Sequence, residues 1–119
     1  MKPKEQVITE FFESINSRHM EEMGRLLKSD AEFYFPKTRP LLGKDKILKF
    51  FNVLFRQYPQ LIFQIHRIIL QGNKAAIHWT NKGYTRKKEP YDNEGVTILE
   101  MEGGKIRFMS DFFKNTEKF

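Results

Sequence analysis

An acidic side chain, Asp111, lies inside an apolar run near the end of the sequence and is the residue best suited to chemistry. Its neighbours Met109 and Phe113 are apolar, so a surface charge is not expected there. Apolar surroundings disfavour the charged form of a carboxyl group and raise its pKa toward neutrality. Asp111 is therefore a candidate general acid or base. The alternative is a structural carboxylate, paired with an arginine, hydrogen-bonded to Trp79 or Tyr84, or facing solvent.

Other side chains are expected to share the face of the sheet that carries Asp111. Asn81 and Thr97 are candidate hydrogen-bonding groups, unless they are solvated residues near strand ends. The following residues are candidates for the wall of an apolar ligand pocket: Phe33, Phe35, Phe50, Trp79, Leu99, Phe108, Met109 and Phe113. Such residues more commonly form ordinary close-packed core. Tyr34 and Tyr91 are candidates for the mouth of the pocket.

The elements that must position Asp111 begin with a β-hairpin. Two apolar runs, 96–101 and 106–113, flank Gly103 and Gly104. Glycine accepts positive φ at little cost, as a tight hairpin turn requires. A second pair of β-rich runs, 61–71 and 74–84, is joined at Gly72 and Asn73, which is another two-residue hairpin signal. These four strands are predicted to form an antiparallel meander.

Three helices are predicted before this meander. Apolar residues recur at helical spacing over 3–17, again over 20–30, and over 44–57. The aromatic stretch 31–36 is predicted to be a strand, and the proline-containing segment 36–43 a loop. The order helix, helix, strand, helix, four strands predicts one α+β domain over residues 1–119, with the helices packed on one face of a curved sheet.

The second face of this sheet also carries apolar residues. In the run 96–99, apolar side chains occur at both odd and even positions and so point to both faces of the sheet. In a sheet that is covered on one face only, apolar and polar residues should alternate along the strand. Ile62, Ile68 and Leu70 are predicted to lie together on the outward face, and His66 and His78 also point outward. We therefore expect a second covering layer, most simply another copy of the sheet in a symmetric homodimer.

The composition excludes several classes of function. The chain has no cysteine, so disulfides and thiolate metal sites are excluded, and no two of its three histidines are expected to lie together. The net charge of +6 is scattered, so nucleic acid is not an expected partner. No apolar leader or membrane-spanning run is present, and the expectation is a soluble cytoplasmic protein without a cofactor.

The element order, with Gly104-Lys105-Ile106 followed by Ser110-Asp111-Phe112-Phe113, resembles the nuclear transport factor 2-like superfamily, particularly its SnoaL-like branch of polyketide cyclase and ketosteroid isomerase relatives. The resemblance covers essentially the whole chain. It implies a cone-shaped α+β barrel whose helices and concave sheet enclose an apolar pocket. Members range from isomerases, cyclases and epoxide hydrolases to proteins without activity, so the fold does not assign a reaction.

The resemblance also implies what this chain lacks. In the limonene epoxide hydrolase branch, an aspartate on the final strand works with an arginine and a second aspartate on an earlier strand, and with a tyrosine and an asparagine on the first strand. The matching positions here hold Trp79 and Asn81, and Phe33 and Phe35, so only Asp111 is retained. Activating water for epoxide opening needs these partners.

Ketosteroid isomerase chemistry is disfavoured in the same way. That enzyme uses an aspartate base with a tyrosine and a protonated aspartate as oxyanion donors, which is a worked example of pKa tuning. Phe35, Phe11 and Thr97 stand at the matching positions. A SnoaL-type cyclase makes lighter demands, because one carboxylate near the final strand can move an acidic proton, and Asp111 matches that role.

The sequence thus supports two hypotheses of different class. The first is a protein that binds a small apolar molecule and uses Asp111 for proton transfer on it, as a cyclase or isomerase does. The second is a module without enzymatic activity, either ligand-binding or a dimerisation scaffold.

Overall fold

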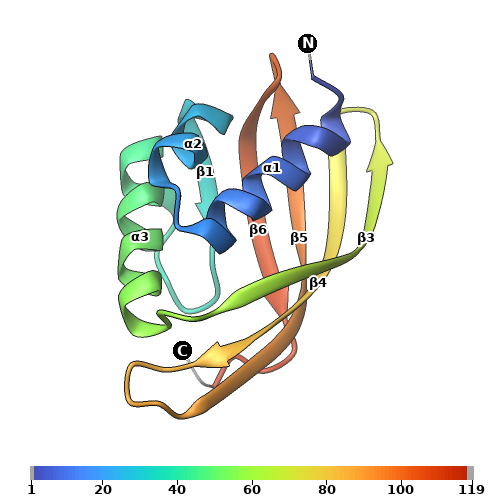
Figure 1. Ribbon diagram of the computed structural model, residues 1–119. Helices are drawn as coiled ribbons and strands as arrows, with labels where there is room; N and C mark the ends of the chain where they lie inside the picture. The colour runs from blue at the N-terminus through green and yellow to red at the C-terminus, as the bar shows by residue number, and fades with distance from the viewer. Residues whose placement is uncertain (1, 118–119) are drawn as a thin grey trace.

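Residues 2–117 are described by a computed structural model of the chain. The elements, in chain order, are α1 (Lys4–Ser17), α2 (Met20–Leu26), β1 (Leu27–Tyr34), β2 (Leu41–Leu42), α3 (Lys44–Gln57), β3 (Ile62–Gln71), β4 (Lys74–Tyr84), β5 (Pro90–Glu102) and β6 (Lys105–Phe113). Figure 1 shows the three helices gathered on one side of a curved sheet. The predicted α+β class is confirmed.

The six strands form one sheet in the order β2-β1-β6-β5-β4-β3. Strands β3 to β6 pair antiparallel in sequence order, which confirms the predicted meander. Strand β1 joins this meander by pairing in parallel with β6, far along the chain. The sheet is curved but does not close, because β2 and β3 form its two edges.

Helices α1 and α3 owe their position to their apolar faces. On α1, Val7, Ile8 and Phe11 recur at helical spacing and are almost completely buried, as are Ile47 and Phe51 on α3. A helix with one apolar stripe is stabilised by packing that stripe against the sheet. The core therefore lies between the helices and the concave face of the sheet, called the inner face below. None of the helices within 2–117 has the length and apolar character to span a membrane.

The second helix and the first strand differ from the prediction. The apolar spacing predicted a helix over 20–30, but α2 ends at Leu26 and β1 begins at Leu27 with no turn between them. Leu27 is buried as a strand residue paired with Ile106 of β6, so tertiary pairing prevails over local helical spacing. The expected loop 36–43 also contains the two-residue strand β2, paired with β1.

The outer face of the sheet, which points away from the helices, includes Ile62, Ile69, Val96, Ile98 and Phe112. The expectation that Ile68 lies there with Ile62 is wrong. A β-bulge shifts the register between Ile65 and Arg67, and beyond it Ile68 pairs with buried Ile77 while Ile69 points outward. One extra residue in a strand reverses the faces of all residues that follow it; Leu70 is likewise displaced from the expected face, pairing with buried Ala75.

The turn between β5 and β6 follows the glycine prediction. Gly103 and Gly104 have φ of 61° and 79°. Two successive positive φ values suit the right-handed twist of a two-residue hairpin. This turn fixes which residues of β5 and β6 lie opposite one another, and so places the side chains described next.

Candidate functional site

Asp111 lies on the inner face of β6, directly opposite Thr97 of β5. The alternation of β6 puts Met109 on the same face, opposite Leu99, and Phe113 opposite Gly95. Strand β1 contributes Phe33 beside Met109 through the parallel pairing. The central strands thus bring one carboxyl group into a surface that is otherwise apolar.

A chain of two hydrogen bonds holds the carboxyl group. The Trp79 indole Nε1–H donates to Thr97 Oγ1 at 2.9 Å, and the Thr97 hydroxyl donates to Asp111 Oδ1 at 2.6 Å. Gly95 makes this possible: a Cβ added there would lie 2.8 Å from the Trp79 ring and 2.8 Å from Phe113 Cβ. The Trp79 indole occupies the space that a side chain at Gly95 would need, and from there its N–H reaches Thr97.

The apolar surroundings of Asp111 raise the pKa of its carboxyl group. Desolvation by burial raises the pKa of Asp111 from 3.8 to about 7, although the hydrogen bond from Thr97 acts in the opposite direction. Within residues 2–117 no lysine or arginine forms an ion pair with it. A carboxyl group that titrates near neutral pH can both accept and donate a proton, which suits general acid–base catalysis.

Two small cavities adjoin Asp111. The first, of about 30 Å³, is lined by Phe11, Phe12, Ile15, Phe33, Phe35, Phe50, Phe51, Leu54, Phe63, Thr97, Met109 and Asp111. The second, of about 10 Å³, is lined by Phe35, Leu54, Leu61, Phe63, Trp79, Asn81, Tyr91, Asp111 and Phe113. Ligand pockets usually measure about 300 to 1,000 Å³. Residues expected to line an apolar pocket do surround these cavities, but neither cavity is large enough for a ligand, and the existence of a ligand pocket here stays a prediction.

Most of the residues predicted for the site meet at these cavities. Phe33, Phe35, Thr97 and Met109 line the first cavity with Asp111, and Trp79, Asn81 and Phe113 line the second. Leu99 is completely buried but lines neither of them.

Three aromatic residues lie elsewhere than expected. Phe108 pairs with Glu100 on the outer face, because it is adjacent in the strand to inward-facing Met109, and its ring packs on Tyr34 with the two centroids 5.5 Å apart. Tyr34 donates to Glu32 at 2.7 Å and is not at a pocket mouth. Tyr91 is buried against Tyr58.

The helices supply lining residues that the sequence argument did not assign to the site. These are Phe11, Phe12 and Ile15 of α1 and Phe51 and Leu54 of α3. The same apolar spacing that predicted the helices marks them as inward-facing. Which inward-facing residues reach Asp111 depends on how the helices cross the sheet, which spacing alone does not determine.

Asn81, which lines the second cavity, carries an unsatisfied acceptor. The residue is 5% exposed, and its Oδ1 has no hydrogen-bond partner among the described residues. A buried polar atom without a partner costs free energy, so such atoms are uncommon in folded proteins. Asn81 and Asp111 therefore present two polar groups to the same small cavity.

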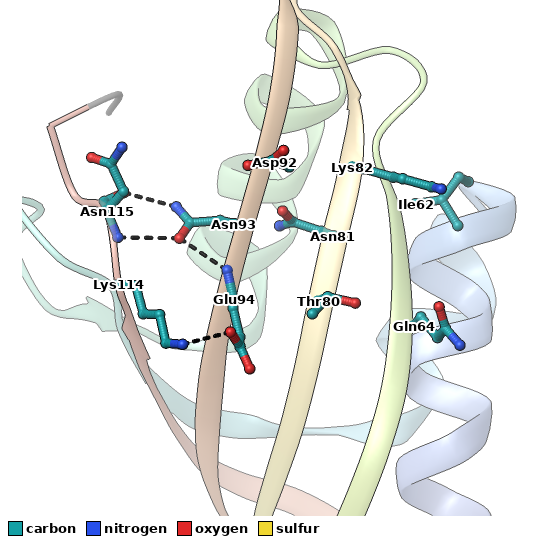
Figure 2. Close-up of a pocket in the computed structure, with 10 residues that line it drawn as sticks. All are labelled: Ile62, Gln64, Thr80, Asn81, Lys82, Asp92, Asn93, Glu94, Lys114 and Asn115. Carbon is teal, nitrogen blue, oxygen red and sulfur yellow. Dashed lines mark hydrogen bonds and ion pairs between the residues drawn. The ribbon is translucent and has the colours of Figure 1, made fainter.

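A larger hollow lies on the other side of the sheet. It measures about 550 Å³ and is lined mainly by residues of the outer face: Ile62, Gln64, Thr80, Asn81, Lys82, Asp92, Asn93, Glu94, Lys114 and Asn115 (Figure 2). Four of its polar residues, Asn93, Glu94, Lys114 and Asn115, are engaged with one another. The Asn93 side chain, for example, donates to the Asn115 carbonyl at 2.7 Å and accepts from the Asn115 amide at 3.1 Å.

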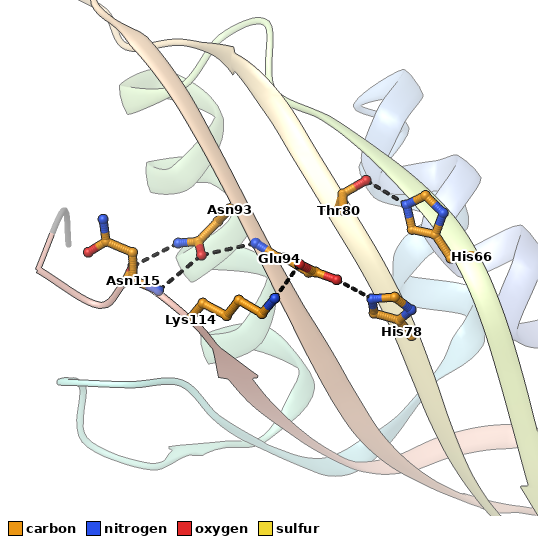
Figure 3. Close-up of polar contacts among 7 residues, drawn as sticks. All are labelled: His66, His78, Thr80, Asn93, Glu94, Lys114 and Asn115. Atoms are coloured by element: carbon orange, nitrogen blue, oxygen red, sulfur yellow. Dashed lines mark hydrogen bonds and ion pairs between the residues drawn. The ribbon is translucent and has the colours of Figure 1, made fainter.

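Glu94 is the centre of a charged cluster beside this hollow (Figure 3). Its two carboxylate oxygens lie 2.6 Å from Lys114 Nζ and 2.6 Å from His78 Nε2. These partners, Lys114 first and then His78, lower the pKa of Glu94 from 4.5 to about 2.

The expectation that no two histidines lie together is wrong. His66 and His78 are on neighbouring strands of the outer face, with ring centroids 5.2 Å apart. The pairing of β3 with β4, which the spacing of twelve residues in the chain does not reveal, brings them together. No group of three or more metal-ligating side chains is found within residues 2–117.

Comparison with known families and structures places this geometry in context. The model of the SnoaL-like domain matches residues 8–109. No curated protein matched the sequence significantly.

Solved structures share the fold at low sequence identity. An NTF2-like protein of unknown function from Burkholderia pseudomallei has a TM-score of 0.90 and 16% identity, covering 99% of this chain and 95% of that one. A candidate SnoaL-like polyketide cyclase from Jannaschia sp. CCS1 has a TM-score of 0.85 and 14% identity, covering 93% and 85%. TerC, co-crystallised with polyporic acid, has a TM-score of 0.85 and 19% identity, covering 95% and 92%.

Proposed function

Because the chain belongs to the SnoaL-like domain family, we propose that it binds a small, largely apolar molecule beside Asp111 and transfers a proton to or from it. The observation that carries the proposal is the carboxyl group of Asp111, which is fixed by Thr97 among aromatic rings and has a pKa of about 7.

The chemistry that fits one such carboxyl group is proton movement next to a carbonyl. The ionised form accepts a proton from carbon, and the resulting acid returns it to another atom of the same ligand, as in an isomerisation or a ring closure. Thr97 keeps the carboxyl oriented in both states, because Trp79 occupies the Thr97 oxygen and directs its hydroxyl hydrogen toward Asp111.

The neighbouring positions limit this reaction. Trp79, Phe33 and Phe35 offer no charged partner, so attack by water on an epoxide lacks the groups that would polarise the leaving oxygen. Besides the Tyr91 hydroxyl, the polar groups within reach of the ligand are then Asp111, Thr97 and Asn81. Proton transfer from a carbon that is already acidic needs the fewest catalytic groups, so it is the reaction that fits this site best.

A thermal-shift screen of apolar carbonyl compounds, lactones and sterol-like compounds tests the proposal. A ligand that binds only the native state stabilises it by mass action, by about 2.7 kcal/mol at a concentration of 100 Kd. We expect compounds that stabilise the wild type and stabilise Asp111→Asn less. Asp92→Asn, a carboxylate exposed on β5, is the matched control and should behave as wild type. Equal stabilisation of all three proteins by every hit would contradict a role for Asp111.

A second candidate function, a dimerisation module, is favoured by the outer face. Ile62, Ile69 and Phe112 are 47%, 64% and 60% exposed there. A second copy of the sheet would cover them. Light scattering at micromolar concentration should give the mass of a dimer for the wild type and of a monomer for Phe112→Asp. Leu42→Asp, exposed on β2 instead, is the control, and a monomeric wild type would contradict this candidate.

A further inference from the structure

Asn81 lies between two hollows, one on each face of the sheet. It lines the outer hollow of about 550 Å³ and also the second inner cavity of about 10 Å³, to which Asp111 contributes. Among residues 2–117, no other residue lines both. Asn81 therefore separates the surroundings of Asp111 from the outer face of the sheet.

The alternation of β4 turns the Asn81 side chain toward the inner face. Ile77, Trp79 and Asn81 are buried at every second position of the strand. Asn81 Oδ1 is a buried acceptor without a partner among the described residues. A donor on a bound molecule at this place would therefore lower the free energy of the folded state.

The amide group on the neighbouring strand is already engaged. Asn81 is paired with Asn93 of β5. The Nδ2 group of Asn93 has two hydrogens, and it donates to the Tyr91 hydroxyl at 3.1 Å and to the Asn115 carbonyl at 2.7 Å. Figure 2 shows the Asn93 side chain directed toward Asn115. Asn93 thus does not satisfy Asn81 Oδ1.

The second cavity has the size and the polarity that one water molecule needs. A cavity of roughly 10 to 15 Å³ holds one water, which requires about two to four polar partners. Asn81 and Asp111 both line this cavity, and the amide oxygen and the carboxylate are both acceptors. A water molecule carries one hydrogen for each of them.

The first cavity, of about 30 Å³, does not offer the same partners. Besides Asp111, its single polar lining residue within 2–117 is Thr97. The Thr97 hydroxyl already accepts from Trp79 and donates to Asp111. Cavities with apolar linings stay dry. The second cavity is therefore the one in which we expect a bound water.

We propose that the second cavity binds one water molecule, which donates one hydrogen to Asn81 Oδ1 and the other to the ionised Asp111 carboxyl group. Asn81 is then a positioning residue that acts on Asp111 through the water. When Asp111 is protonated, its O–H donates to the water oxygen, so the same water serves both states. This inference deepens the proposed function and rests on it, since proton transfer at Asp111 gives the water its role.

The water adds a donor to the ionised carboxyl group, beside the one that Thr97 supplies. Loss of a donor to a carboxylate raises its pKa. Tyr91 is the other titratable group of this cavity, and burial raises its pKa to about 12, so it stays protonated near neutral pH. The remaining lining residues carry no titratable group: Phe35, Leu54, Leu61, Phe63, Trp79, Asn81 and Phe113. The titration of Asp111 therefore reports on the water.

NMR titration of the Asp111 carboxyl carbon in Asn81→Leu tests the proposal. Leucine resembles asparagine in shape but has no acceptor, so the water loses one of its two partners. We expect the Asp111 midpoint to rise by about one pH unit or more. Asn81→Val, which is smaller and also lacks the acceptor, gives the same readout if the leucine variant does not fold.

Two further variants serve as controls. Asn81→Ser retains an acceptor for the water and should restore most of the wild-type midpoint. Gln64→Leu makes the same change of an amide to an apolar side chain, at an exposed position that lines the outer hollow but not the inner cavity. It should titrate as the wild type does.

A high-resolution crystal structure of the wild type locates the water directly. We expect electron density in the second cavity, within hydrogen-bond distance of both Asn81 Oδ1 and the Asp111 carboxyl group. An ordered cavity without such density, or a water that contacts only one of the two groups, would overturn the proposal. This measurement does not depend on the folding of any variant.

The outcomes separate the water site from the proposed function. An unchanged or lower Asp111 midpoint in folded Asn81→Leu or Asn81→Val overturns the water site, whichever compounds bind to the wild type. A rise that persists in Asn81→Ser reflects altered packing and also overturns it. A rise that Asn81→Ser reverses supports it. If the midpoint behaves in this last way but no compound of the thermal-shift screen stabilises the wild type, the water site is supported and the proposed ligand-binding function is contradicted.

Discussion

Asp111 and Glu94 are two carboxyl groups on opposite faces of the same sheet, and their surroundings shift them in opposite directions. Asp111 lies among aromatic rings with one hydroxyl donor, and its pKa rises to about 7. Glu94 accepts from a lysine and a histidine at the protein surface, and its pKa falls to about 2. Desolvation dominates the first group, and hydrogen bonds from Lys114 and then His78 dominate the second.

The comparison also shows that volume and chemistry are separate properties of a pocket. The hollow beside Glu94 has a ligand-sized volume of about 550 Å³, but its Glu94 carboxylate is already paired with Lys114 and His78. The cavities beside Asp111 are small, yet they hold the group with the shifted pKa and an amide oxygen without a donor. The inner face is the candidate site because of the shifted pKa of Asp111 and the unpaired Asn81 oxygen, and not because of the volume of its cavities.

The largest expected effect comes from filling the space behind Trp79. In Gly95→Ala the new methyl group would overlap the Phe112 carbonyl oxygen, Phe113 and the Trp79 ring. Overpacking of this severity should cost more than about 3 kcal/mol of unfolding free energy, measured by urea denaturation. Gly24→Ala is the control, since its methyl group would meet Leu48 at an ordinary 3.4 Å and α2 gains a better helix former. Equal stability of the two variants would contradict the role of Gly95.

The next effect depends on pH. The folded pKa of Asp111 is raised above 3.8, so its burial costs nothing below about pH 4, and the wild type should lose stability as the pH rises toward 7. Asp111→Asn carries no charge at any pH and should not show this loss. We expect it to be equal in stability to the wild type at pH 4 and more stable by about 2 to 3 kcal/mol at pH 8, allowing for the partial exposure of the residue.

Urea denaturation of both proteins at the two pH values measures this difference. A constant difference between wild type and Asp111→Asn across the range would show that the carboxyl group is not desolvated in the folded state.

A smaller loss of stability is expected from replacing Thr97, which links Trp79 to Asp111 in the hydrogen-bond chain. Thr97→Val leaves the Trp79 N–H without its acceptor and should cost about 1 to 2 kcal/mol. It also removes the donor to the ionised Asp111, so the pKa of Asp111 should rise above its wild-type value. Thr80→Val, which loses a hydrogen bond to His66 on the outer face, serves as the matched control. A lower pKa of Asp111 in Thr97→Val would contradict the hydrogen-bond chain.

The smallest effect should follow from Glu94→Gln. Surface ion pairs contribute little to stability and are screened by salt. Because the folded pKa of Glu94 is lowered, its contribution is present above about pH 4.5 and is lost as the pH falls toward 2. Thermal denaturation in low and high salt should show a difference from wild type that is smaller than for Thr97→Val and weaker in high salt. A large loss of thermal stability that does not depend on salt would show that the Glu94 cluster stabilises the fold more than the hydrogen-bond chain at Asp111 does.

Elements with strong local signals could be predicted from the sequence. Helix α3 has the expected bounds Lys44–Gln57, and the glycine turns place β3, β4 and β6 to within one residue. Strand β5 ends near the expected residue but begins at Pro90, well before the run expected to start at residue 96. The start of β1 at Leu27 could not be predicted, because apolar spacing continues from α2 and only the distant pairing with β6 reveals the strand. The bulge at His66 has no local signal either, and it changed the face assigned to Ile68.

The candidate site was predictable where strand alternation applies. Asp111, Thr97 and Trp79 share the inner face because every second residue of a strand points to the same side of the sheet. The order of the hydrogen bonds, from Trp79 through Thr97, depends on the space at Gly95 and is a property of packing. The small free volume depends on how seven phenylalanine rings meet, which no pattern in one strand or helix records.

The most direct test of the account is the titration of the Asp111 carboxyl carbon by NMR, with its resonance assigned from the spectrum of Asp111→Asn. We expect a midpoint near pH 7, about three pH units above the ordinary 3.8 of an aspartate. A midpoint at or below 3.8 would show that the carboxyl group is solvated or paired with a cation, and would contradict its role as a general acid or base at neutral pH.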